Sequence, residues 1–244
     1  MDSHAQSNKL PIIEFTEKNL IPGTSSWKST SDSIRWALES YGCLVVDYDK
    51  ARLEQGYQPV FGLLEELFGL PMETKMKYTS QFKGFGYDGN HPAMPLYESF
   101  GIEDGATLES VERFAKLMWP LGHDKFCETM QSNSKVSLEL IHMVMKMVLS
   151  SYGLEKYSNS LIESSFYMKR LIRYKSQGEN ETSIGILPHR DKSFMSIIST
   201  NEVKGLQIET PQGEWIEFEP SPSKFILIVG EAFMVRSSNS ISPL

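Results

Sequence analysis

The sequence predicts an α+β protein in which a helical layer covers an antiparallel double-sheet or barrel core. Two observations carry this prediction. Residues from about 30 to 155 show the apolar spacing of amphipathic helices, whereas residues from about 165 to 236 form short β-rich runs separated by turn residues. The length of 244 residues suits one large domain, or one domain with a helical annexe.

The helical part contains three apolar stripes, each followed by a residue type that ends helices. Gly42 follows the first stripe, Gly69 and Pro71 the second, and Gly153 the third. The stripes consist of Ile34, Ala37, Leu38 and Tyr41; of Tyr57, Phe61, Leu64 and Phe68, with Pro59 near the first turn; and of Leu138, Ile141, Met145, Val148 and Tyr152. The third gives the strongest helix signal and predicts a long helix over residues 134–152, and the run 43–46 predicts a buried strand after the first helix.

The second part of the chain has the shorter period of β-strands. Strands are expected at residues 166–174, 194–199, 206–209, 215–218 and 225–229, with a further start at 233–235. The sequence Thr-Pro-Gln-Gly at residues 210–213 predicts a hairpin turn between the third and fourth of these.

Composition and charge exclude several function classes. Hydrophobic residues make up 40% and charged residues 23%, and 24 basic against 31 acidic residues give a net charge of −7 without a basic block. We therefore expect no nucleic-acid partner and no membrane partner. Cys43 and Cys127 form no CxxC pair, and the polar N-terminus has no apolar signal region. These features predict a cytoplasmic protein with reduced thiols, which we expect to be a monomer.

One of the five histidines has a partner at metal-ligand spacing. Asp191 follows His189 by two residues, and in an extended segment over 186–192 both side chains would leave the same face. An imidazole and a carboxylate are two of the three ligands of a facial non-haem Fe(II) site. Taken alone, the pair fits a surface strand better than a metal site. The remaining histidines are expected to be solvent-exposed or packing residues: His4, His91, His123 and His142.

Several stretches match, in order, the pattern of one enzyme family. They are 10–15 (LPIIEF), 41–46 (YGCLVV), 67–75 (LFGLPMETK), 187–198 (LPHRDKSFMSII), 203–208 (VKGLQI), 213–216 (GEWI) and 225–231 (FILIVGE). Together they resemble the plant 2-oxoglutarate/Fe(II)-dependent dioxygenases over nearly the whole chain. Within that family, residues 96–102 (LYESFGI) and 189–192 (HRDK) most resemble the enzymes that modify glucosinolate side chains.

The resemblance implies a double-stranded β-helix (jelly-roll) core at residues 156–244 behind a mostly helical leader region at 1–155, with Fe(II) and 2-oxoglutarate as cofactors. His189 and Asp191 match the first histidine and the carboxylate of the iron triad. Tyr174 matches the tyrosine that hydrogen-bonds 2-oxoglutarate, although Arg173 replaces the usual asparagine before it and an ordinary strand tyrosine is the alternative. Substrate-facing residues are expected, from position alone, around Phe85 and Tyr97.

The family pattern also contains a second metal histidine, followed by an Arg-x-Ser whose guanidinium pairs with the distal carboxylate of 2-oxoglutarate. No histidine follows His189, and the sequence reaches residue 244 about where the pattern approaches that histidine. Glu231 and Asn239 could offer an oxygen, but nothing in their spacing indicates it. The expectation is therefore a shortened, inactive relative that lacks the last strands of the jelly roll.

Two alternatives to the inactive relative stay open at this point. The first is an active Fe(II)/2-oxoglutarate dioxygenase with a degenerate metal site. The second is a non-enzymatic binding protein on the same scaffold. No exposed apolar stripe or charge run in the sequence supports this second alternative.

Overall fold

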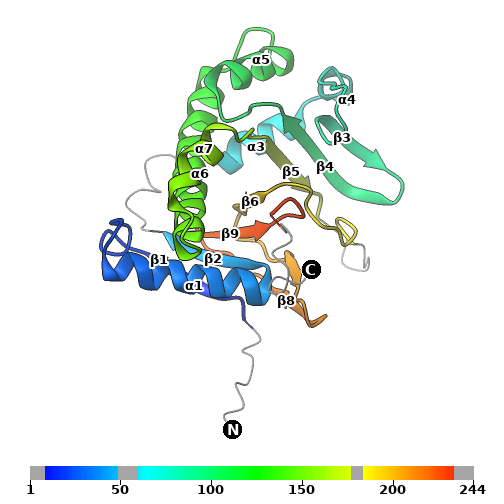
Figure 1. The fold of residues 1–244 in the computed structure, drawn as a ribbon. Coiled ribbons are helices and arrows are strands. Elements are labelled where there is room, and N and C mark those ends of the chain that lie inside the picture. The colour runs from blue at the N-terminus through cyan, green and yellow to red at the C-terminus, as the bar shows by residue number, and fades with distance from the viewer. Residues whose placement is uncertain (1–8, 49–59, 177–183, 234–244) are drawn as a thin grey trace. The chain divides into compact units, whose positions relative to one another are not determined.

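The computed structural model describes residues 9–48, 60–176 and 184–233, and Figure 1 follows the chain through its helices and strands. These residues belong to two compact units. Unit 1 comprises residues 1–53, 139–164 and 190–244, and unit 2 comprises residues 54–138 and 165–189. Both units therefore combine segments that are far apart in the sequence. The predicted division at residue 155 follows a family pattern rather than compactness, and it stays a prediction.

Unit 1 contains a four-stranded sheet in the order β1 (Ile12–Phe15), β2 (Cys43–Tyr48), β9 (Lys224–Val229) and β6 (Met195–Ile198). β1 runs parallel to β2, and the other neighbours are antiparallel. The two central strands are buried along nearly their whole length, as their apolar sequences predict. The expected strands around 43–46, 194–199 and 225–229 are confirmed.

Helix α1 (Ser25–Tyr41) packs beside β2 in unit 1, with the predicted apolar stripe turned inward. The Thr24 hydroxyl accepts a hydrogen bond from the backbone N–H of Trp27, which caps the first turn. Gly42 ends the helix at φ 69°, a left-handed conformation that glycine adopts without strain. Local signals therefore determine both ends of this helix.

The predicted hairpin of unit 1 is also present. β7 (Gln207–Glu209) pairs with β8 (Trp215–Glu217) in antiparallel register. The backbone N–H of Gly213 donates to the carbonyl of Thr210 at 2.9 Å, and this glycine has φ 81°. The hairpin directs one isoleucine from each strand, at 208 and 216, into the core of unit 1.

The longest helix, α6 (Asp124–Ser151), begins at Asp124 rather than at the expected residue 134. Its first turns bury Phe126 and Met130 completely, so the apolar face continues upstream of the stripe that the sequence indicated. After the helix, Gly153 has φ 69° as predicted. The chain continues through the short helices η1 (Glu155–Tyr157) and α7 (Ser158–Glu163). Among the described residues, no helix is long and apolar enough to cross a membrane.

Unit 2 contains a three-stranded antiparallel sheet in the order β3 (Gly86–His91), β4 (Met94–Ile102) and β5 (Lys169–Tyr174). β5 was expected, whereas β3 and β4 lie in the region expected to be mostly helical. That expectation was wrong for these two strands. Their sequence carries glycine, proline, asparagine and single charges, so it shows neither a β-branched run nor a clear alternation.

The helices of unit 2 are α3 (Val60–Gly69), α4 (Met72–Lys75) and α5 (Leu108–Met118). The buried face of α3 consists of Val60, Leu63, Leu67 and Phe68. The predicted stripe thus lies on a helix as expected, with Phe68 buried and Leu64 partly buried against the same core, while Val60, Leu63 and Leu67 carry more of the buried face than the stripe indicated. Tyr57 and Pro59 lie outside the described residues. The fully buried ring of Phe100 on β4 packs against Phe68 at a centroid distance of 5.5 Å and against Phe114 at 5.2 Å.

Candidate functional site

His189 lies in an irregular segment, residues 184–194, between β5 and β6. The expected extended strand over 186–192 is not present, because regular pairing with β9 starts only at Met195. The imidazole is exposed, and its Nδ1 lies 2.9 Å from the carbonyl oxygen of Leu187. A carbonyl only accepts, so this contact requires a proton on Nδ1, and a metal would bind through Nε2.

Asp191 is held in unit 1 by the end of β9. Its backbone carbonyl accepts the N–H of Glu231 at 2.8 Å, and the N–H of Gly230 donates to Phe194 at 3.1 Å. These bonds continue the pairing of β6 with β9 without the regular strand geometry. The carboxylate of Asp191 accepts a hydrogen bond from the hydroxyl of Ser196, which orients it.

The approach of these two segments requires glycine at position 230. A Cβ atom there would lie 2.0 Å from the carbonyl oxygen of Ser193 and 2.9 Å from that of Asp191. Both contacts are with backbone atoms, which cannot rotate away. Gly230 is therefore a positioning residue for the segment that carries Asp191.

The donors fit an iron site in kind, but the described residues do not complete one. His189 is the last residue of a segment of unit 2, whereas Asp191 belongs to unit 1. That the two side chains lie on the same face therefore stays a prediction. No group of three or more His, Cys, Asp or Glu that could hold a metal occurs among the described residues. Glu231 forms an ion pair with Lys192, and Asn239 lies outside the described residues. Because a facial triad needs three protein ligands, the described residues alone do not form one.

Tyr174, the expected 2-oxoglutarate ligand, lies at the end of β5 opposite Tyr97 on β4. Burial raises the pKa of its phenol to about 12, although nearby Arg170 acts in the opposite direction. The phenol is thus protonated at neutral pH and can donate to a carboxylate. Gly185 lies against the ring, since a Cβ there would be 2.7 Å from the Cδ1 of Tyr174.

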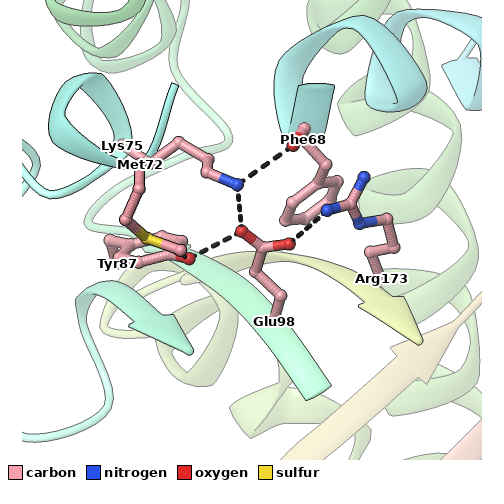
Figure 2. Close-up of polar contacts among 6 residues, drawn as sticks. All are labelled: Phe68, Met72, Lys75, Tyr87, Glu98 and Arg173. Atoms are coloured by element: carbon pink, nitrogen blue, oxygen red, sulfur yellow. Dashed lines mark hydrogen bonds and ion pairs between the residues drawn. The ribbon is translucent and has the colours of Figure 1, made fainter. Parts of the chain in front are cut away.

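Arg173, which replaces the family's asparagine, points to the opposite side of β5. Its Nη2 donates to Oε2 of Glu98 at 2.6 Å, and Glu98 is its partner in the strand register. Figure 2 shows that Glu98 also accepts from Lys75 and Tyr87. The replacement is therefore balanced by a buried carboxylate in the core of unit 2.

The other described histidines are surface or packing residues, as the sequence predicted. His91 pairs with Asp88, and His123 lies 3.1 Å from Glu66 at the surface. His142 is half-buried in α6, and burial lowers its pKa. His4 lies outside the described residues.

A cation on the Tyr174 side of β5 was missed by the sequence interpretation. Arg170 precedes Tyr174 by four residues in a strand, which places both side chains on one face. Of the two residues suggested from position, Tyr97 is buried beneath this face and donates to Ser99 at 2.8 Å. Phe85 lies near Phe166, with ring centroids 6.1 Å apart. The period of two was visible in the sequence, but the contacts of Arg170 were not.

Comparison with known proteins identifies relatives of this chain. The family model of the 2OG-Fe(II) oxygenase superfamily matches residues 163–242. An Arabidopsis thaliana protein named as a probable 2-oxoglutarate-dependent dioxygenase, AOP1, is 36% identical over 231 residues, which cover 93% of this chain and 75% of that protein. A second Arabidopsis thaliana relative, named as a probable inactive 2-oxoglutarate-dependent dioxygenase, AOP2, is 25% identical over 320 aligned residues, covering 96% of this chain and 79% of its own length.

A solved structure gives the fold independently. The dioxygenase for auxin oxidation 1 from Arabidopsis thaliana, in a binary complex with 2-oxoglutarate, matches with a TM-score of 0.79 at 22% identity. The match covers 96% of this chain and 84% of that protein. It confirms the predicted α+β fold with a jelly-roll core.

Proposed function

The chain belongs to the 2OG-Fe(II) oxygenase superfamily, and from this membership we propose that its 244 residues form a dioxygenase scaffold with an incomplete iron site. In this proposal, His189 and Asp191 are two metal ligands and Tyr174 donates a hydrogen bond to 2-oxoglutarate. The polypeptide by itself oxidises no substrate. The substrate of the complete family site is a small molecule, and we propose that it is a glucosinolate whose side chain is oxidatively modified.

One observation carries the proposal of inactivity. A complete facial site needs a second histidine, and no histidine follows His189 in the sequence. An imidazole and a carboxylate alone hold a labile divalent metal weakly. We expected the 2-oxoglutarate-binding arginine to be missing as well. The sequence does contain an Arg-x-Ser, however, because Arg236 is followed by two serines. They lie outside the described residues, and Arg236 is therefore included in the test.

The test measures metal binding and turnover separately on the 244-residue protein. We expect weak binding of Mn(II), a redox-stable substitute for Fe(II), in calorimetry, and no succinate from 2-oxoglutarate with Fe(II) and ascorbate. His189→Ala and Asp191→Ala should weaken Mn(II) binding further. His91→Ala, which removes an exposed histidine paired with Asp88, is the matched control and should change nothing.

A repaired chain makes the same test positive. Fusion of a C-terminal segment that supplies the histidine and the Arg-x-Ser of the family pattern should restore turnover, and His189→Ala should abolish it again. Substantial succinate formation by the unrepaired protein would refute the proposal and favour the active alternative. In that case, loss of activity in Arg236→Met would identify the arginine that binds 2-oxoglutarate.

We also propose that the protein is a cytoplasmic monomer. The free, buried thiols of Cys43 and Cys127 support a reducing compartment. Light scattering at micromolar concentration should give the mass of one chain, and a fluorescent fusion in plant cells should distribute through the cytoplasm. A dimer mass or an organellar signal would contradict it.

A further inference from the structure

The outer face of β5 carries a regular row of partly exposed side chains. Arg170, Ile172 and Tyr174 alternate with Leu171 and Arg173, which point into the core of unit 2. The strand register places Gly101, Ser99 and Tyr97 of β4 opposite this row. Ser99 and Tyr97 are buried beneath it. A cation and a phenol that donates hydrogen bonds are thus presented together on one side of the sheet.

Four neutral acceptors hold the guanidinium of Arg170. Its Nη1 lies 3.3 Å from both the Tyr97 hydroxyl and the Ser99 hydroxyl. Its Nη2 donates to the carbonyl of Gly84 and lies 3.7 Å from the thioether of Met168. Among the described residues, no carboxylate forms an ion pair with Arg170. The positive charge is therefore fixed in position without a counter-charge from this part of the chain.

The contacts leave one edge of the guanidinium suited to an oxyanion. Nε and Nη2 lie on the same edge, and two parallel N–H donors on one edge match the oxygens of a carboxylate or a sulfate. Nε has no hydrogen-bond acceptor among the described residues, and the contact of Nη2 other than the carbonyl of Gly84 is with the sulfur of Met168, which accepts weakly. An anion would replace that sulfur contact and provide the missing charge.

Apolar side chains lie next to the groups that Arg170 contacts. Phe166 and Met168 precede Arg170 on the chain and expose 61% and 41% of their surface. Phe85 connects Phe166 to Phe82 through ring contacts of 6.1 and 6.2 Å, and Phe82 is 64% exposed. Exposed aromatic rings next to an uncompensated cation suit a ligand with an apolar body and an anionic group.

We propose that Arg170 is a specificity-determining residue that pairs, through its Nε–Nη2 edge, with the oxyanion of a small organic anion whose apolar body contacts Phe85 and Phe166. The inference rests on the proposed function only in placing this face, with Tyr174, on the ligand side of unit 2. A carboxylate and a sulfate share the required geometry. If Arg170 only fastened the loop at Gly84 to the sheet, its removal would lower stability without charge-selective loss of binding.

The test uses two fluorescent probes that differ in one charged group. They are 8-anilinonaphthalene-1-sulfonate and the uncharged N-phenyl-1-naphthylamine, titrated into the full chain without iron or 2-oxoglutarate. Arg170→Met should weaken binding of the sulfonate about tenfold, equivalent to ~1.4 kcal/mol, and change binding of the uncharged probe less than about twofold. Arg113→Met, which removes an exposed arginine paired with Glu109 on α5, should leave both unchanged.

A second pair of variants keeps Arg170 in place. Met168→Glu puts a carboxylate beside Nη2 and should exclude the sulfonate, whereas the isosteric Met168→Gln should not. Displacement by octyl sulfate but not octanoate would assign a sulfate, and the reverse a carboxylate; octan-1-ol should displace neither. Equal sulfonate binding by Met168→Glu and Met168→Gln, or unchanged binding by Arg170→Met, overturns the proposal. Because iron is absent, failure here leaves the succinate test unaffected.

Discussion

Replacing Glu98 by glutamine tests the charge network at the centre of unit 2. Glu98 is only 2% exposed, and its Oε1 accepts hydrogen bonds from Lys75 and, at 2.6 Å, from the Tyr87 hydroxyl. Its Oε2 accepts from Arg173 at 2.6 Å. As Figure 2 shows, one carboxylate thus balances two cations that come from α4 and β5.

The expected cost follows from the burial of Lys75. This lysine is 4% exposed, and its Nζ has one further acceptor, the carbonyl of Phe68 at 3.0 Å. Removing one partner of a buried ion pair costs about 3–5 kcal/mol, because the other charge stays buried without compensation. The side chain of Arg173 is 33% exposed, so Arg173→Met should cost only about 1 kcal/mol. We therefore expect Glu98→Gln to lower the free energy of unfolding by about 3–5 kcal/mol.

Urea unfolding measures these differences, and a double-mutant cycle separates the pair from its surroundings. Lys75→Met introduced into Glu98→Gln should recover part of the loss, since the uncompensated charge is then absent. Glu109→Gln removes a carboxylate that is 82% exposed and should cost less than about 0.5 kcal/mol. A loss of stability in Glu98→Gln no larger than in Glu109→Gln, or additive costs in the cycle, would refute the reasoning.

The pH dependence gives an independent reading of the same network. Burial acts to raise the pKa of Glu98, but the hydrogen bonds from Lys75, Tyr87 and Arg173 outweigh it and lower the pKa below 4.5. A carboxyl group whose pKa is lower in the folded state stabilises the fold above its unfolded pKa, and this stability is lost as pH falls through the folded pKa. Glu98→Gln should therefore reduce the loss of stability between neutral pH and acid.

Three further predictions concern other sites. Burial lowers the pKa of Lys169 to about 7. Between pH 7 and 10 this lysine is therefore protonated in the unfolded chain but not in the folded one, so the stability of the fold rises with pH. Urea midpoints should increase over this range, and they should increase less in Lys169→Met. Gly230→Ala should lower stability and weaken Mn(II) binding by displacing the Asp191 segment, whereas Gly62→Ala, where a Cβ meets nothing within 4 Å, should do neither. Burial raises the pKa values of the Cys43 and Cys127 thiols, that of Cys43 to about 12. A thiol reagent should therefore react slowly with the native protein, and it should titrate two thiols after denaturation without reductant. Fewer than two thiols would indicate a disulfide.

Elements with local signals were the ones that the sequence could predict. α1 has an apolar stripe, a threonine cap and a left-handed glycine, all within twenty residues of one another. β2 and β9 are continuous apolar runs because both lie in the interior of a sheet. β3 and β4 lack such runs, and they form because β4 pairs with β5, more than sixty residues later in the chain. Tertiary pairing of this kind leaves little trace in the sequence of either strand.

The same limit applies to the candidate site. The spacing of His189 and Asp191 is visible as letters, but the backbone bonds from Gly230 and Glu231 that hold Asp191 connect residues about forty positions apart. Arg170 could be placed on one face with Tyr174 from the period of two. Its lack of a carboxylate partner among the described residues depends on the register of β4 and on the position of Gly84, and neither can be derived from the sequence.

Strand alternation also determines the effect of Arg173, which stands where the family pattern has asparagine. Because Arg173 and Tyr174 are neighbours in β5, their side chains leave opposite faces of the sheet. Arg173 therefore adds its charge to the core of unit 2, where the buried carboxylate of Glu98 balances it. The cation that lies on the same face as Tyr174 is Arg170, and its charge opposes the burial that raises the pKa of that phenol. A substitution at Arg173 should consequently change stability, whereas one at Arg170 should change the ligand charge that this face accepts.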